Sequence, residues 1–138
     1  MKRSLFLDTN VVLDIVLERH EFLKEARELL LLSDNNDIEL FTSALTIAHC
    51  AYFAKKFRKD PILTVTSLLK WFEIVDLKRQ HFESTILSKF KDFEDGLQFF
   101  SANEAKAIDY IITRDINDFK VSTIPVLSPK DFLLTFNK

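Results

Sequence analysis

The sequence contains a single glycine, Gly96, and this scarcity excludes the common nucleotide-binding loops. Such loops need several glycines at fixed positions, because the backbone must approach a phosphate closely. The single cysteine, Cys50, rules out an intramolecular disulfide, and nothing indicates an oxidising compartment. No stretch reaches the roughly 18 apolar residues of a membrane helix, and Asp8 interrupts the first apolar run too early for a signal peptide. We therefore expect a cytoplasmic protein without membrane association.

The hydrophobic and charged content of the chain predicts one folded domain over residues 1–138. Hydrophobic residues make up 47% of the chain and charged residues 29%, which is typical of a globular protein with a substantial core. The formal net charge is only −2, so the overall charge does not indicate binding to nucleic acid. Any function that involves RNA must therefore be inferred from a local site.

Short apolar runs alternate with segments of helical periodicity along the whole chain. Asn10 and Ser43 are expected N-caps, and Pro61 and Pro129 are expected at the first position of two further helices. We expect strands at residues 4–7, 38–41, 72–75, 109–112 and 124–127, and other helices at residues 11–17, 21–33, 44–57, 79–89 and 93–106. Strands separated by helices favour parallel pairing with helices on both faces, which is an α/β three-layer domain.

Acidic residues fall where such a sheet binds ligands, beyond the carboxyl ends of its strands. Asp8 ends the first expected strand, Asp115 follows the fourth, and Glu94 and Asp95 begin the helix before it. Carboxylates without basic neighbours repel one another, and a divalent cation would neutralise them. Ligation by oxygen alone suits Mg²⁺ or Mn²⁺, which can activate water for hydrolysis of a phosphodiester.

Each acidic segment also has a purely structural interpretation. Residues 8–10 could form a simple turn between a strand and a helix, and acids at 92, 94 and 95 are favoured at any helix N-terminus. Asp115 and Asp118 could cap a short turn. Asp14 could face the site or pair with Arg19. It is the combination of segments that favours a functional site.

Lys55, Lys56, Arg58 and Lys59 form a basic cluster beside three aromatic residues. One interpretation is a patch that binds the RNA backbone. The other is a solvated helix C-terminus, where basic residues are favoured by the helix dipole.

Three segments together resemble the PIN-domain family, in particular bacterial toxin ribonucleases of the VapC type. They are residues 6–22 (FLDTNVVLDIVLERHEF), 92–102 (DFEDGLQFFSA) and 111–119 (IITRDINDF). The resemblance extends from Leu5 to about Phe132. It implies a five-stranded parallel sheet and acids that bind Mg²⁺ or Mn²⁺. It also implies cleavage of single-stranded RNA by metal-activated water, and an antitoxin partner and a homodimer are common among such proteins.

The same resemblance assigns roles by position. Asp8, Asp95 and Asp115 correspond to the first, third and fourth metal-binding acids, and Glu94 is a possible further ligand or an acid that positions water. Asn10, Thr113 and Asp118 correspond to supporting polar positions. His49 stands where the family normally has its second acid, a glutamate. It could ligate a metal, contact the substrate or move a proton, or mark a site with weakened metal affinity.

Two other functions are alternatives to a nuclease. A phosphatase of the haloacid dehalogenase kind requires a second aspartate two residues after the first, and this chain has Asn10 there. The stronger alternative is a PIN-fold module that binds RNA or protein with lost or weakened nuclease activity, and His49 is its main support.

Overall fold

The structure, a computed structural model, describes residues 2–105 and 107–137. It contains a five-stranded, wholly parallel sheet, as predicted, and the strand order is β3-β2-β1-β4-β5. The strands are β1 (Arg3–Leu7), β2 (Ile38–Ser43), β3 (Phe72–Val75), β4 (Tyr110–Ile112) and β5 (Val126–Leu127).

Seven α-helices and one 3-10 turn complete the described residues. They are α1 (Thr9–Val16), α2 (Leu23–Asp34), α3 (Ala44–Lys56), α4 (Pro61–Trp71), α5 (Arg79–Ile86), α6 (Phe93–Glu104), η1 (Ile116–Phe119) and α7 (Pro129–Phe136). The predicted cap at Ser43 is confirmed, since its Oγ accepts a hydrogen bond from the Thr46 N–H at 3.1 Å. Pro61 and Pro129 open α4 and α7, also as predicted.

Several predicted boundaries were wrong, and Asn10 is not a cap. Asp8 caps α1 instead, because its Oδ1 accepts from the Thr9 N–H at 2.8 Å. Asp109 lies outside β4, where its carboxylate accepts from the Ser4 N–H at 2.7 Å. Helix α5 ends at Ile86 rather than at residue 89, and β5 begins only at Val126. The predicted end of the sixth helix, residue 106, lies outside the described residues.

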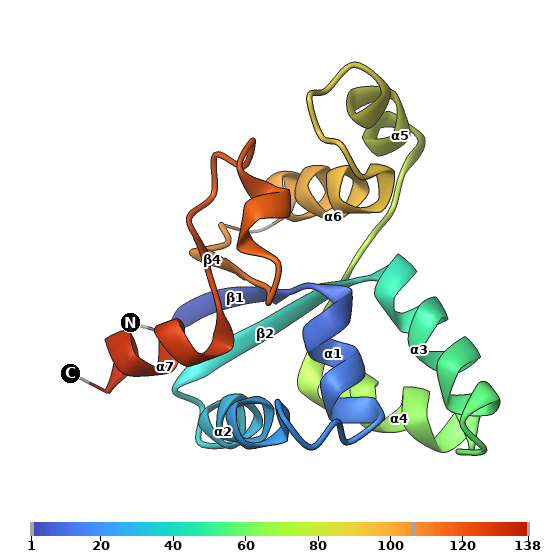
Figure 1. Cartoon of the computed structure of the whole chain (residues 1–138), viewed down its shortest axis with the longest axis vertical. Helices are drawn as coiled ribbons and strands as arrows, with labels where there is room; N and C mark the ends of the chain where they lie inside the picture. The colour runs from blue at the N-terminus through green and yellow to red at the C-terminus, as the bar shows by residue number, and fades with distance from the viewer. Residues whose placement is uncertain (1, 106, 138) are drawn as a thin grey trace.

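The two faces of the sheet are covered by different helices (Figure 1). Alternate side chains of β1 point to opposite faces, as the pleat of a strand requires. Leu5 and Leu7 belong to a core with apolar residues of α1, α2, α3, α4 and α7. Phe6 belongs to a second core, with Phe99 of α6 and Phe119 of η1. The result is the predicted three-layer α/β/α arrangement.

The topology places a crevice at the end of β1. The chain passes from β1 to β2 and β3 on one side, and later adds β4 and β5 on the other. The order of strands therefore reverses between β1 and β4, and open α/β sheets bind ligands outside such a switch point. Separately, none of the helices in the described ranges is both long and apolar enough to span a membrane.

Candidate functional site

Carboxylates from three separate parts of the chain line one groove of about 530 Å³ at this switch point. Asp8 comes from the end of β1, Glu94 and Asp95 come from the first turn of α6, and Asp115 and Asp118 follow β4. The other lining residues are Thr9, Asn10, Leu13, Arg19, His49, Tyr52, Phe53, Asp92 and Gln98. The five acids that the resemblance names as site residues thus all line one groove.

Asp8 is the buried carboxylate of the groove, with 6% of its surface exposed. Its Oδ2 accepts a hydrogen bond from Thr113 Oγ1 at 2.9 Å, and its Oδ1 accepts from the Thr9 N–H. Burial raises the pKa of Asp8 above its ordinary value, while these hydrogen bonds oppose the rise. Asp8 is therefore held in one orientation by Thr9 of α1 and by Thr113, the residue that follows β4.

Asp95 is a second acid of the groove with a raised pKa. Partial burial and the negative charges of Asp8, Asp92, Asp118 and Asp115, in that order, raise its pKa to about 7. Asp92 caps α6 by accepting from the Asp95 N–H at 3.1 Å, so its structural interpretation is confirmed. The groove consequently carries negative charge that its own residues do not neutralise.

Asn10 and Thr113 fix the segment that carries Asp115. Asn10 Nδ2 donates to Asp115 Oδ2 at 3.0 Å and lies 3.3 Å from Thr113 Oγ1. The Asp115 N–H donates to the same Thr113 oxygen at 3.1 Å. Asp115 precedes η1, but its side chain makes no cap hydrogen bond there. The two supporting positions predicted by the resemblance thus link Asp8 to Asp115.

Gln98 is a site residue that the sequence reasoning missed. It is 1% exposed, and its Nε2 lies 2.7 Å from Thr46 Oγ1, 2.8 Å from Thr9 Oγ1 and 3.4 Å from Asp8 Oδ1. The signal that could have found it is its spacing, three residues after Asp95 and four after Glu94 on the same helical face. Its amide joins α6 to α1 and α3 beneath the groove.

His49 reaches across the groove from α3 to α6. Its Nε2 lies 3.3 Å from Oε1 of Glu94, with about a third of the imidazole exposed. The position that the resemblance gives to a second acid is thus occupied by a side chain that contacts an acid of α6.

Asp14, which could have faced the site, lies outside the groove. It is 1% exposed and pairs with Arg114 at 2.8 Å and with Arg19 at 3.4 Å. The first of these partners was not foreseen.

The predicted basic cluster sits at the C-terminal end of α3 and contributes no residue to the lining of the groove. Lys55 and Lys56 occupy the last turn of the helix, as the dipole favours. Lys59 Nζ donates to Glu18 Oε1 at 3.3 Å on the surface. Arg58 is exposed and has a positive φ of 60°.

The donor set fits a hard divalent cation in its chemistry. The groove offers carboxylate oxygens, and burial together with the charges of neighbouring carboxylates raises the pKa of Asp95. In the part of the chain that the structure describes, no three acidic, histidine or cysteine side chains already converge on one ligation point. Ligation therefore requires the exposed carboxylates to turn toward Asp8.

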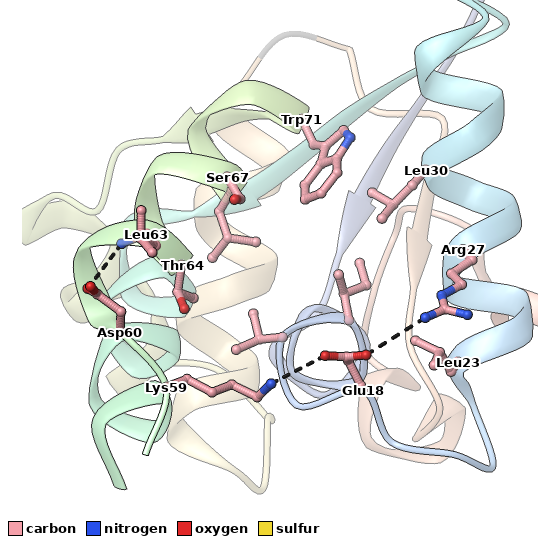
Figure 2. A pocket seen from close by; sticks show the side chains of 13 residues that line it. Glu18, Leu23, Arg27, Leu30, Lys59, Asp60, Leu63, Thr64, Ser67 and Trp71 are labelled. Carbon is pink, nitrogen blue, oxygen red and sulfur yellow. Dashed lines mark hydrogen bonds and ion pairs between the residues drawn. The ribbon is translucent and has the colours of Figure 1, made fainter. Parts of the chain in front are cut away.

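A second concavity, of about 400 Å³, lies between α1, α2 and α4 (Figure 2). Leu30, Leu63 and Trp71 are among its apolar walls. Glu18 lies at its mouth between Lys59 and Arg27, at 3.3 and 3.7 Å, and Asp60 caps α4 through the Ile62 and Leu63 N–H groups. Its acids are thus engaged in ion pairs and a helix cap, and the pocket is separate from the candidate active site.

Comparison with known proteins agrees with this geometry. The family model described as "PIN domain" matches residues 4–117. The chain belongs to the PIN-domain family. It is 29% identical over 143 residues to Ribonuclease VapC1 of Aquifex aeolicus (strain VF5), an alignment that covers 97% of this chain and 96% of that one.

Two solved structures share this fold. One is the VapBC2 complex from Rickettsia felis bound to a DNA fragment from its promoter, with a TM-score of 0.64 and 17% identity. The other is a toxin–antitoxin complex from Klebsiella pneumoniae, with a TM-score of 0.67 and 22% identity. Each match covers 91% of this chain and 98% of the other. These two matches show that the fold of the chain is shared with both structures.

Proposed function

We propose that this PIN domain is a cytoplasmic, metal-dependent endoribonuclease that cleaves single-stranded RNA as the toxin of a toxin–antitoxin pair. The observation that carries the proposal is the meeting of Asp8, Asp95 and Asp115, from three distant segments, in one groove at the switch point of the sheet. Such an arrangement of carboxylates costs stability unless a cation neutralises it, and clusters of this kind are typical of functional sites.

Asp8, Asp95 and Asp115 would hold Mg²⁺ or Mn²⁺, with Glu94 as a further oxygen donor. When bound, such an ion lowers the pKa of a bound water and stabilises negative charge on a phosphate under attack. Thr113 keeps Asp8 oriented, and Asn10 keeps Asp115 close to it. Asp118 adds negative charge, since it is among the acids that raise the pKa of Asp95.

The relatives support the biological role. The curated relative is named as a ribonuclease, and the two structural neighbours are described as a VapBC complex and a toxin–antitoxin complex. We infer that a small antitoxin protein binds and blocks this chain. A homodimer stays a prediction.

The test is an assay of purified protein on single-stranded RNA with Mg²⁺, with Mn²⁺ and with a chelator. Asp8→Asn and Asp95→Asn should each lower the cleavage rate by about a hundredfold or more while the circular dichroism spectrum stays native. Asp37→Asn, at an exposed acid outside the groove, is the matched control. Cleavage that persists with chelator, or in both groove variants, would overturn the proposal.

The alternative function is a PIN-fold module that binds RNA or protein but has lost or weakened nuclease activity. His49 favours it, because the groove has an imidazole where the family pattern expects a carboxylate. A wild-type protein that binds RNA without cutting it, and that cuts after His49→Glu, would establish this alternative.

A further inference from the structure

The wall of the groove that α3 supplies is aromatic. His49, Tyr52 and Phe53 all line the groove, and their spacing of three and four residues places them on one face of the helix. Tyr52 follows His49 by three residues, a rise of about 4.5 Å along the helix axis. Its side chain is 64% exposed, so its ring is open to solvent immediately beyond the acids.

The Tyr52 ring contacts a second aromatic ring on the same helix. Phe53 is half-buried and meets it edge to face, with 5.3 Å between ring centroids and an interplanar angle of 83°. Phe53 in turn has Lys56 Nζ 5.8 Å from its centroid, and Lys56 lies one helical turn beyond Tyr52. Exposed aromatic rings together with nearby cations are typical of surfaces that bind single-stranded nucleic acid.

The charges of the groove explain why an uncharged contact is needed there. Asp8, Glu94 and Asp95 repel the phosphates of an approaching strand, and Arg19 is the one cation among the residues described as lining the groove. Arg19 also forms an ion pair with Asp14 at 3.4 Å, which partly neutralises its charge. Stacking of a base on an aromatic ring adds affinity without a phosphate contact.

We propose that Tyr52 is a stacking platform for a nucleobase of the RNA, at the nucleotide next to the phosphate that would lie at the metal-binding end of the groove. This rests on the proposed function and names a substrate contact that the metal-binding acids do not provide. A base inside a duplex is already stacked on its neighbours, so such a platform selects single strands. It has little preference among bases, because every base has a π face.

The test compares removal of the ring with removal of the base. Short single-stranded RNAs, each with one abasic nucleotide at a successive position, are titrated against the full chain in the presence of Mg²⁺. Every protein carries Asp95→Asn, so that the RNA survives the measurement. Tyr52→Leu should weaken binding of intact RNA by roughly 5- to 150-fold, whereas Tyr52→Phe and Tyr52→Trp should bind like Tyr52.

The deciding quantity is the coupling between the two removals. At one abasic position, the protein with Tyr52 should bind the abasic RNA more weakly than intact RNA by the same factor. The Tyr52→Leu protein should bind both RNAs with equal affinity. Phe57→Leu is the matched control, because Phe57 is 55% exposed beside α3 but does not line the groove, and it should leave affinity unchanged.

Other outcomes separate this inference from the proposed function. If Tyr52→Leu weakens binding of abasic and intact RNA equally, or leaves both unchanged, Tyr52 does not stack and the inference is wrong, while cleavage by the wild-type chain still supports a nuclease. If Tyr52→Leu lowers affinity for a protein partner only, Tyr52 belongs to a docking surface and the inference is again overturned. A wild-type chain that neither binds nor cleaves RNA would overturn both.

Discussion

The guanidinium of Arg114 donates two hydrogen bonds to the carboxylate of Asp14, from Nε to Oδ2 at 2.8 Å and from Nη2 to Oδ1 at 3.3 Å. Arg114 also stacks on Phe22, with its central carbon 3.9 Å from the ring centroid. The residue immediately before Asp115 is thereby attached to α1 and to the segment that leads into α2.

Loss of Arg114 should destabilise the fold strongly. Burial raises the pKa of Asp14, and the hydrogen bonds from Arg114 oppose that rise. Arg114→Met leaves a buried carboxylate with one weaker partner, so we expect the free energy of unfolding to fall by about 3 kcal/mol. Urea denaturation measures it. The double variant with Asp14→Leu should recover most of the loss, and a single-variant cost below about 1 kcal/mol would show that the pair matters little.

Asp95 should make the metal-free protein less stable as the pH rises. Its pKa in the folded chain is about 7, above its ordinary value of 3.8, so the folded state holds the proton more tightly than the unfolded state. Its contribution to stability is therefore lost between about pH 4 and pH 7. Asp95→Asn should raise the Tm at pH 8 by roughly 3 °C or more and have little effect at pH 4.

The same melting experiment contains its own controls. Millimolar Mg²⁺ should reduce the difference in Tm between Asp95→Asn and wild type at pH 8. The ion neutralises the groove of the wild-type protein more than that of the variant. Asp37→Asn should show no comparable dependence on pH. A constant difference in Tm across the pH range would mean that Asp95 is not the titrating group.

A carboxylate at position 49 should strengthen cation binding. His49 Nε2 lies 3.3 Å from Glu94 Oε1, so His49→Glu adds a second negative charge beside Glu94. We expect Mn²⁺ to bind roughly tenfold more tightly by calorimetry, with faster RNA cleavage. His49→Gln keeps a hydrogen-bonding side chain without charge and should show no such gain. Equal Mn²⁺ affinity in the wild-type, His49→Glu and His49→Gln proteins would show that position 49 does not affect metal binding.

Replacement of the only glycine, Gly96, should destabilise the fold for a steric reason. A Cβ at Gly96 would lie 2.5 Å from Thr85 Cγ2, and Thr85 is fixed by donating to the His81 carbonyl at 2.7 Å. In an open helix, Gly→Ala stabilises by about 1 kcal/mol, whereas this clash should make Gly96→Ala destabilising by about 1–3 kcal/mol. Urea denaturation gives the sign. Thr85→Ser removes Cγ2 and keeps the hydroxyl, so it should restore part of the loss in the Gly96→Ala background.

Much of the fold and the acidic part of the site could be predicted from the sequence, because their signals are local. Short apolar runs marked the strands, Ser43 and Pro61 marked helix starts, and Asp8 and Asp115 followed apolar strands directly. The predicted start of β4 was wrong because a side chain takes the place of a backbone partner there. The Asp109 carboxylate accepts the hydrogen bond from the Ser4 N–H. The cap of α1 was misplaced for a similar reason, since Asp8 both caps the helix and faces the groove.

The sequence by itself determined the α/β layering and the three acidic segments, since periodicity and strand ends depend on neighbouring residues alone. Only the tertiary structure decided which side chains meet. Gln98 contacts Thr46 across 52 positions of the chain, Arg114 contacts Asp14 across 100, and Tyr52 lines the acidic groove because α3 packs beside it. Such contacts depend on how separate helices pack against the sheet, and no local pattern of residues encodes that geometry.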